Sequence, residues 1–350
     1  MKKFLSVVLT IFKVIIALAL VLELIYITMA VFNLNIDNKF RTERGRYGQN
    51  PTWLADSDST EVDDLYARIA TDGADDIAYE IYNLGCKKLM LSKNYGVRAT
   101  STITAKAGKY VIDVASNRTE QYEVAGTPVL NANQKVYSSY TNTIYVTNIN
   151  DDALAGVLKN VIQFADRGYS DTENSYKQKG KLSVMEENED GEGEEVIDWA
   201  TTYETLDTSG DRKYKDDEIR EKCNFIITKN TILPNSASVE RVYDEKAGDY
   251  VYTVKFSLDC SDFSEGSATY YEVKALKDTL GENMRSITYT KLDIQFTVGS
   301  NGYMRSWHSI QEWTLLYAVS IFKLEGTATF DKSELFSYYA PECEVVNFTK

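Results

Sequence analysis

Histidine, proline and cysteine are scarce in this chain of 350 residues, which contains 1 histidine, 4 prolines and 4 cysteines. Because His308 is the only histidine, metal centres built from several histidines are excluded. The cysteines, Cys86, Cys223, Cys260 and Cys343, form no C-x-x-C pair, which excludes zinc knuckles and thioredoxin-like redox sites. In an oxidising compartment they could form disulfides in several alternative pairings, and otherwise they would be buried free thiols.

Basic residues are also fewer than acidic residues. The chain carries 38 Lys and Arg residues against 52 Asp and Glu residues, a formal net charge of −14. Nucleic acids and broad anionic lipid surfaces are bound mainly by clustered Lys and Arg, so neither is an expected partner. The sequence contains no P-loop and no dinucleotide-binding glycine motif after a strand.

A catalytic centre is not indicated. A Ser-His-Asp triad would require His308, which lies in a predicted strand between Trp307 and Trp313. Ser320 and Lys323 have Ser-x-x-Lys spacing, but a strand lacks the helical turn that brings Lys to Ser. Acidic pairs abound, and none is singled out as facing another across a substrate. We therefore expect no enzymatic activity, with a glycan-active enzyme as the less favoured alternative.

The longest apolar run is Phe4–Asn33, in which Lys13 and Glu23 are the only charged residues. A helix crosses a bilayer core with about 20 mostly apolar residues. Residues 1–33 are therefore predicted to be an uncleaved, single-pass transmembrane anchor, with a cleaved signal peptide as the alternative. Glu23 would face a partner helix or hydrogen-bond locally.

The predicted orientation places the remaining chain outside the cytoplasm. Lys2 and Lys3 favour a cytoplasmic amino terminus, although basic residues between positions 39 and 46 pull the other way. Large carboxy-terminal domains cross membranes largely regardless of charge. Beyond the anchor we expect a polar stalk at 34–56 and one extracytoplasmic domain at 57–350. Its acidic run at 186–198 is predicted to be a solvated loop, or alternatively a weak cation or partner tail.

Residue periodicity changes along the domain. Helical spacing predicts helices near 59–73, over Asp75–Leu91, over Asp151–Asp166 and over Ser267–Leu280. Between and after them, alternation of apolar and polar residues predicts strands separated by Gly or Asn turns, with Asn301-Gly302 as a hairpin turn. The predicted strands are Thr100–Ala105, Tyr110–Val114, Gln121–Val124, Val136–Val146, Asn224–Leu233, Ser238–Tyr243, Tyr250–Leu258, Ser286–Val298, Tyr303–Leu316 and Phe322–Phe330.

This order predicts an α+β fold, with the transmembrane helix followed by a curved antiparallel sheet, or half-barrel, packed with helices. A helix over Asp75–Leu91 runs into strands after Gly96, and Ser286–Val298 turns at Asn301-Gly302 into an aromatic-rich strand. In these features the chain resembles the LolA/LppX-like lipoprotein carriers. That resemblance implies a half-barrel that binds an apolar or lipid-like ligand without catalysis. The uncleaved anchor and the acidic run depart from the family and argue against a free shuttle.

One segment resembles a calcium-binding EF-hand loop. Asp207, Ser209, Asp211 and Glu218 supply oxygen side chains at loop positions one, three, five and twelve. Arg212 stands where the loop normally needs glycine, at a cost of about 1 kcal/mol or more if φ is positive. The residues therefore predict a weak Ca²⁺ site, with an acidic turn as the alternative.

Three aromatic residues, Tyr303, Trp307 and Trp313, share one strand face by parity. They are candidates for lining an apolar cavity between sheet and helices, and the alternative is an ordinary hydrophobic core. The favoured function is a membrane-anchored extracytoplasmic protein that binds an apolar or lipid-like ligand. The alternative is a non-catalytic envelope scaffold that meets partner proteins through its acidic surface.

Overall fold

The computed structural model describes most of the chain beyond position 60. The described residues are 61–124, 126–127, 136–151, 155, 163–170, 174–187, 193–200, 204–207, 225–246, 248–270, 273, 284–319 and 322–338.

Three short helices open the described chain. They are α2 (Val62–Ala67), α3 (Ile69–Asp72) and α4 (Ala74–Met90). In α4, acidic Asp75 and Asp76 lie in the first turn and basic Lys87 and Lys88 in the last, which suits the helix dipole at both ends. The predicted helix over Asp75–Leu91 is thus present with nearly the expected bounds.

The rest of the fold is one antiparallel sheet of twelve strands. Several strands reach 14 to 16 residues, far beyond the usual strand of about 5–6 residues. The strands are β1 (Asn94–Ala107), β2 (Tyr110–Val124), β3 (Val136–Ile149), β4 (Phe164–Ser170), β5 (Asn174–Glu187), β6 (Gly193–Trp199), β7 (Glu204–Asp207), β8 (Ser238–Asp244), β9 (Asp249–Ser257), β10 (Met284–Gly299), β11 (Met304–Val319) and β12 (Phe322–Ser337).

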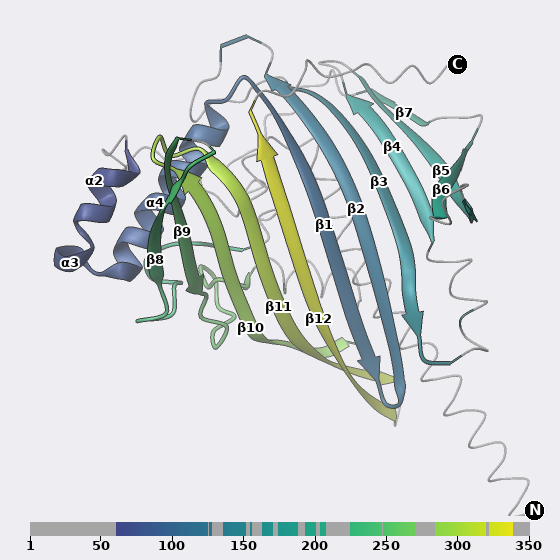
Figure 1. The fold of residues 1–350 in the computed structure, drawn as a ribbon. Coiled ribbons are helices and arrows are strands. Elements are labelled where there is room, and N and C mark those ends of the chain that lie inside the picture. The colour runs from purple at the N-terminus through teal and green to yellow at the C-terminus, as the bar shows by residue number, and fades with distance from the viewer. Residues whose placement is uncertain are drawn as a thin grey trace, which may run out of the picture.

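The sheet has a simple order, β6-β5-β4-β3-β2-β1-β12-β11-β10-β9-β8, with β7 paired to β5 (Figure 1). Neighbouring strands in this order are consecutive in sequence, except for β1 and β12, which pair along almost the whole length of β1. The strand β7 is a second exception, because it pairs with β5 and not with β6 or β8. The pairing of β1 with β12 joins an amino-terminal arm to a carboxy-terminal arm in one continuous, bent surface. The helices gather beside the carboxy-terminal arm, where α4 packs against β8, β9 and β11.

The predicted fold class is corrected by this architecture. Instead of an α+β fold with an N-terminal transmembrane helix, the described chain is mostly one large antiparallel sheet with three short helices. Among the described residues, no helix is both long enough and apolar enough to cross a bilayer. The predicted anchor (1–33, with Glu23) and stalk (34–56) lie outside the described residues.

Two predicted elements are also replaced by strand. The helix expected over Asp151–Asp166 ends in strand β4, because Phe164–Asp166 pair with β3. Much of the acidic run at 186–198 is hairpin: Glu187 ends β5 and residues 193–198 lie in β6, which pairs back onto β5. Acidic side chains are tolerated on such strands where one face is open to water.

The hydrophobic core of the carboxy-terminal arm is an aromatic cluster between α4 and the sheet. The Tyr82 ring of α4 lies 5.9 Å from Phe296, 5.8 Å from Trp307 and 6.3 Å from Phe256, centroid to centroid. Phe296 and Trp307 stack at 5.9 Å across β10 and β11. Aromatic pairs at these distances add to the free energy gained by burying their large apolar surfaces.

The hairpin turn between β10 and β11 is hydrogen-bonded to the start of α2. Gly302 has φ of 80°, and its N–H donates to the Gly299 carbonyl at 2.9 Å, as expected for the predicted Asn-Gly turn. The Val62 N–H donates to the Ser300 carbonyl at 3.0 Å, so α2 begins against this turn.

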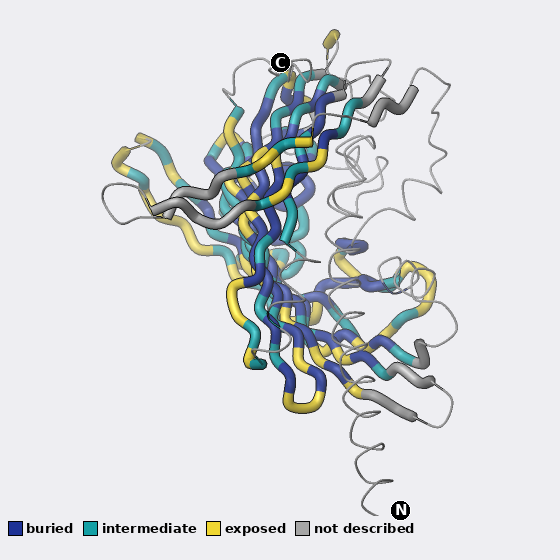
Figure 2. The backbone as a smooth tube through the Cα atoms, turned by 90° about the vertical axis from the view of Figure 1, so that its right-hand side faces the viewer, coloured by how far each residue is buried: buried dark blue, intermediate teal, exposed yellow. Residues whose placement is uncertain are grey.

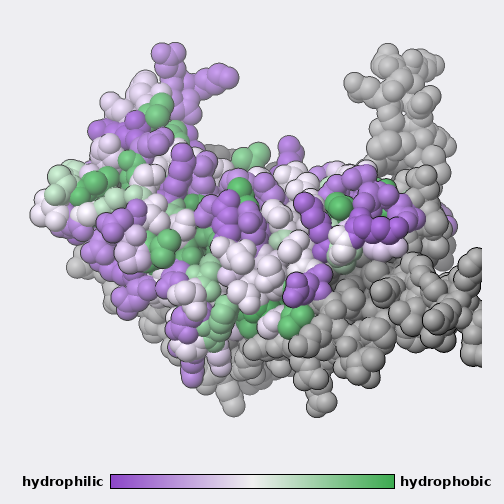
Figure 3. Space-filling model, turned by 90° about the horizontal axis from the view of Figure 1, so that it is seen from below, coloured by the Kyte–Doolittle hydropathy of each residue, from purple (hydrophilic) through white to green (hydrophobic). Residues whose placement is uncertain are grey.

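Burial follows the strands in the pattern expected of a sheet with one covered face. Figure 2 shows buried stretches through the body of the sheet and exposed ones at hairpin ends. β1, for example, alternates buried and exposed or half-buried residues along most of its length. On the face seen in Figure 3, hydrophobic residues are scattered among hydrophilic ones.

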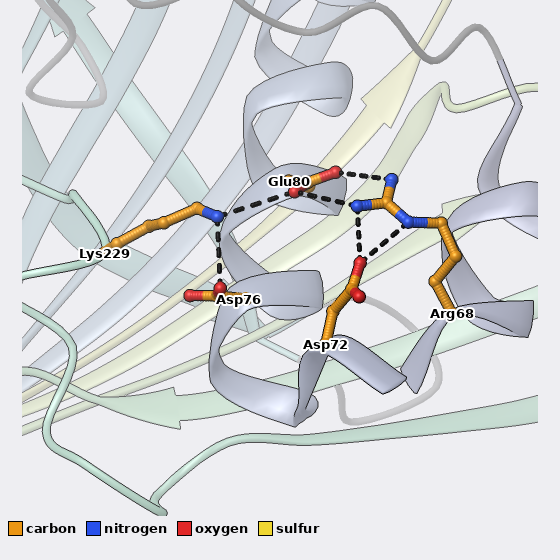
Figure 4. A network of polar contacts seen from close by, with 5 residues as sticks. All are labelled: Arg68, Asp72, Asp76, Glu80 and Lys229. Atoms are coloured by element: carbon orange, nitrogen blue, oxygen red, sulfur yellow. Dashed lines mark hydrogen bonds and ion pairs between the residues drawn. The ribbon is translucent and has the colours of Figure 1, made fainter. Parts of the chain in front are cut away.

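A surface network of ion pairs holds the helices together (Figure 4). Arg68 contacts Asp72 and reaches Glu80 of α4 at 3.1 Å, while Lys229 bridges Asp76 at 3.2 Å and Glu80 at 3.5 Å. These side chains are partly exposed, so the network fixes the packing of α3 and α4 more than it adds stability.

Candidate functional site

Charged and polar side chains form a row across the helix-facing side of the sheet. Residues paired directly across neighbouring strands point to the same side, and the register aligns one residue from each strand. From β4 to β11 the row reads Asp166, Asn142, Arg118, Ala99, Glu334 and Trp307. Trp307 contacts Tyr82 of α4, so this row continues the surface that the helix covers.

Every polar member of this row is buried. Asp166, Asn142 and Glu334 are exposed by 2 %, 0 % and 1 %, and Arg118 by 8 %. Charged groups are almost never this buried unless they are paired. The polar row is therefore the most chemically unusual feature of the described residues.

Arg118 is held from two sides. Its Nε donates to Glu120, and Glu120 also accepts a hydrogen bond from the Tyr122 hydroxyl. The guanidinium group lies over the Tyr140 ring, 4.7 Å from its centroid. Stacking on an aromatic face and pairing through Nε are typical of a planar guanidinium fixed in one orientation.

The two terminal nitrogen atoms of the Arg118 guanidinium group have no hydrogen-bond acceptor. Both Nη1 and Nη2 of Arg118 are buried, and neither makes a hydrogen bond. Burial lowers the pKa of Arg118, but Glu120, Tyr122 and Asp166 together raise the pKa by more, so the net shift is upward and the group is charged. A buried charged fork with two open donors is rare, because each unmade hydrogen bond has a free-energy cost.

The two carboxylates of the row, Asp166 and Glu334, each have a cationic partner. Asp166 accepts hydrogen bonds from the Tyr140 hydroxyl at 2.7 Å and the Asn142 amide at 2.9 Å, and lies 3.7 Å from Lys177 Nζ. On the other side of β1, Glu334 lies 3.2 Å from Lys332 Nζ. The three carboxylates are thus matched by three cations.

The absence of a side chain at Gly168 leaves room for the Tyr140 ring. A Cβ on Gly168 would lie 2.1 Å from Tyr140 Cε1, far inside van der Waals contact. The Tyr140 ring therefore lies flat over β4, where its hydroxyl reaches Asp166 and its face meets Arg118. A larger residue at position 168 would displace the ring on which the guanidinium rests.

The predicted cavity residues are placed apart by the structure. Trp307 and Trp313 are buried in the hydrophobic core, where Trp307 stacks on Phe296 and Trp313 pairs in register with Tyr289. Tyr303 precedes β11, is half-buried, and meets the Tyr338 ring at 4.8 Å. Whether any of them lines a ligand cavity stays a prediction.

The predicted calcium loop lies almost wholly outside the described residues. Asp207 is the last residue of β7, while Ser209, Asp211 and Glu218 are not described. Within the ranges that are described, no group of His, Cys, Asp and Glu residues is arranged to hold a metal ion.

The lone histidine lies on the other side of β11 from the two tryptophans. His308 Nε2 is 2.9 Å from Asp331 Oδ1 on β12, and both side chains are partly exposed. This pair occupies an open strand face.

The described cysteines are in the thiol form. Cys86 is buried and Cys260 is half-buried, and neither forms a disulfide. Cys260 borders a surface groove of about 450 Å³ with Leu258 and Phe263, and burial raises its pKa to about 11. Such a thiol is almost entirely protonated at neutral pH and is a poor nucleophile. Cys223 and Cys343 lie outside the described residues.

Sequence reasoning missed the polar row for a definite reason. In β2, Ile112, Val114, Arg118, Glu120 and Tyr122 all have the same parity and face the same side. Charged residues at the inward positions of a strand are the signal that would have indicated the site. The prediction divided β2 into two strands, Tyr110–Val114 and Gln121–Val124, so the residues at 115–120 were not assigned to either face of a strand.

Comparison with known proteins leaves the chain without a family. No protein-family model and no curated protein matches it. Among solved structures, a DUF1329 family protein from Desulfovibrio piger is 8% identical with a TM-score of 0.20, covering 76% of this chain and 94% of that one.

A structure of MucB in complex with MucA(peri) is 8% identical with a TM-score of 0.13, covering 72% of this chain and 92% of that one. The Pseudomonas aeruginosa MucA/MucB complex is 9% identical with a TM-score of 0.09, covering 72% and 93%. Likeness at this level carries no argument about fold or function. The resemblance to LolA/LppX-like carriers therefore stays a prediction from the sequence.

Proposed function

We propose that this protein is a non-catalytic binding protein that holds an apolar or lipid-like ligand against the helix-facing side of its sheet. The observation that carries the proposal is the extent of that face. The described helix α4 packs against β8, β9 and β11, yet the same face continues across β12, β1, β2 and β3.

The continuing face is apolar beside the polar row. Ile103 on β1, Ile112 and Val114 on β2 and Ile144 on β3 are all buried there. Near the turn between β1 and β2, the pairs between β1 and β12 are small, because Ala105 pairs with Ala328 and Ala107 with Gly326; farther along, Ile103 pairs with Phe330. The apolar floor is the part of this face formed by Ile103, Ala105, Ile112, Val114, Ile144 and Ala328. An apolar surface next to fixed polar groups has the composition of a site for a ligand with one polar end.

Native mass spectrometry of the full-length protein tests this function. We expect an apolar molecule to co-purify with the protein in a one-to-one ratio. The variant Ala105→Leu/Ala328→Leu raises the floor and should reduce the bound fraction, because the added side chains occupy ligand volume. Thr327→Leu, on the opposite, exposed face of β12, is the matched control. A protein that carries no apolar molecule, and takes up none when one is offered, would refute the proposal.

We also propose that the protein works outside the cytoplasm. The apolar character of Phe4–Asn33 supports this location. Protease treatment of intact cells tests it: cleavage of the domain is expected, and full protection would contradict it.

A second candidate function is protein interaction, as a scaffold in the cell envelope. Of the described strands, β8 ends the sheet, and it exposes Val242 by 62% and Tyr243 by 53%. Exposed edge strands with apolar side chains can pair with other chains. Val242→Lys would abolish such an association, seen as loss of a cross-linked partner, and would leave the bound apolar molecule in place.

A further inference from the structure

We propose that Arg118 receives an uncharged oxygen acceptor of the ligand, namely the carbonyl of an acyl ester or amide, and not a free carboxylate. This inference rests on the proposed function, because it names the ligand group that the apolar floor delivers to the polar row. The starting observation is the pair of buried Arg118 donors, Nη1 and Nη2, that have no hydrogen-bond acceptor.

The orientation of Arg118 indicates where the acceptor must lie. Nε is taken by Glu120 and one face of the guanidinium by the Tyr140 ring at 4.7 Å. The open edge therefore carries Nη1 and Nη2 together. Two parallel N–H donors at this edge match a single carbonyl oxygen with two lone pairs, or two oxygens of one ester group.

The charge balance of the row decides between a neutral and an anionic acceptor. Arg118 is paired with Glu120, Lys177 with Asp166 and Lys332 with Glu334. Each of these three carboxylates is thus matched by a cation, and Lys179, which pairs in register with Asp166, is exposed. A bound carboxylate would add an uncompensated buried negative charge, which is strongly unfavourable. A carbonyl would satisfy both donors and leave the balance unchanged.

The apolar part of the ligand explains why the acceptor can reach a buried group. Because neither Nη atom is open to water, an acceptor must displace the atoms that enclose the guanidinium. Ile103, Ala105 and Ala328 are already buried, so the free energy for this exchange comes from the acyl chain of the ligand as it leaves water to pack on them. Acyl esters and amides combine both features.

Competition with a neutral probe tests the inference on the full-length protein. N-phenyl-1-naphthylamine reports occupancy of the apolar floor, and it is displaced by decanoic acid or by its glycerol monoester, which share one acyl chain. At pH 7.5, where the acid is ionised, we expect the monoester to displace the probe at a concentration about tenfold or more below that of the acid.

The variant Arg118→Lys keeps the charge beside Glu120 and removes the forked donors. It should abolish most of the preference for the ester over the acid. Arg118→Gln/Glu120→Gln, which removes the ion pair as a unit, is a second variant in case the first fails to fold. Arg167→Lys is the matched control, since Arg167 stacks on Trp199 elsewhere on β4.

The outcomes separate the two proposals. Equal or tighter binding of the acid, or an ester preference that survives both Arg118 variants, overturns the inference while the apolar site stands. If neither the probe nor either ligand binds, the proposed function fails, and this inference fails with it.

Discussion

At the scale of single residues, Trp307 should be among the largest contributors to stability. It is 6% exposed and packs on both Phe296 and Tyr82. We expect Trp307→Ala to lower the free energy of unfolding by about 3–5 kcal/mol, because it leaves a large cavity. Tyr243→Ala, at a residue that is 53% exposed, is the control and should change it little. Urea denaturation measures both, and a small effect of Trp307→Ala would contradict its place in the core.

Asp249 gives a prediction about pH. Its carboxylate accepts hydrogen bonds from the Ser300 hydroxyl at 2.7 Å and the Tyr250 N–H at 2.7 Å, and the Ser300 bond is the main cause of its lowered pKa. Because the folded-state pKa lies below the ordinary value of 3.8, the stabilisation is complete above that value. It is lost as the pH falls through the folded-state pKa.

The measurement is the difference in urea midpoint between wild type and Asp249→Asn as a function of pH. We expect a constant difference from neutral pH down to about 3.8 and a decline below it. Ser300→Ala should weaken the pH dependence, since it removes the strongest hydrogen bond. A difference that does not change with pH would show that the carboxylate is not stabilised in the folded state.

At the scale of elements, Gly168 of β4 lies directly opposite Tyr140 of β3. A Cβ there would be 2.1 Å from the ring, so we expect Gly168→Ala to displace Tyr140 and disturb its contacts with Asp166 and Arg118. The predicted result is a marked loss of stability together with weaker ester binding. Thr141→Ala, on the exposed side of β3, is the control for both measurements. Unchanged stability and binding in Gly168→Ala would contradict the packing of β3 on β4.

The same scale explains which parts of the fold were predictable. Helix α4 and strands β8 to β11 were found from sequence, because their apolar periodicity is regular and Asn301-Gly302 marks a strong turn. In contrast, Phe164–Asp166 were assigned to a helix, since the apolar spacing before them is helical and only pairing with β3 makes them strand. The acidic run at 186–198 gave no strand signal, because charge indicated a loop.

The candidate site was less predictable than the fold. The aromatic residues were recognised by type, yet their contacts with Tyr82 depend on how α4 lies across the sheet. Arg118 and Glu120 share one face of β2, but Asp166 reaches them only through the register of β2, β3 and β4. Long-range register cannot be read from local periodicity once a strand is divided at the wrong place.

At the scale of the whole molecule, a single sheet performs two tasks. Its carboxy-terminal arm packs on α4 in a core centred on Phe296 and Trp307, and this core continues into the buried residues Ile103 and Val114 of β1 and β2. Across the β1–β12 pair, the same face carries the small apolar residues and the polar row. We therefore expect the carboxy-terminal arm to contribute most to stability, and the ligand to bind at the junction of the two arms.

The most direct test of this expectation is hydrogen–deuterium exchange of the full-length protein with and without the glycerol monoester of decanoic acid. We expect slower exchange on ligand binding in β1, β2, β3 and β12, with Arg118 at the centre of the protected region and no change in β8. Protection confined to β8 and β9, or no protection anywhere at saturating ligand, would contradict this expectation.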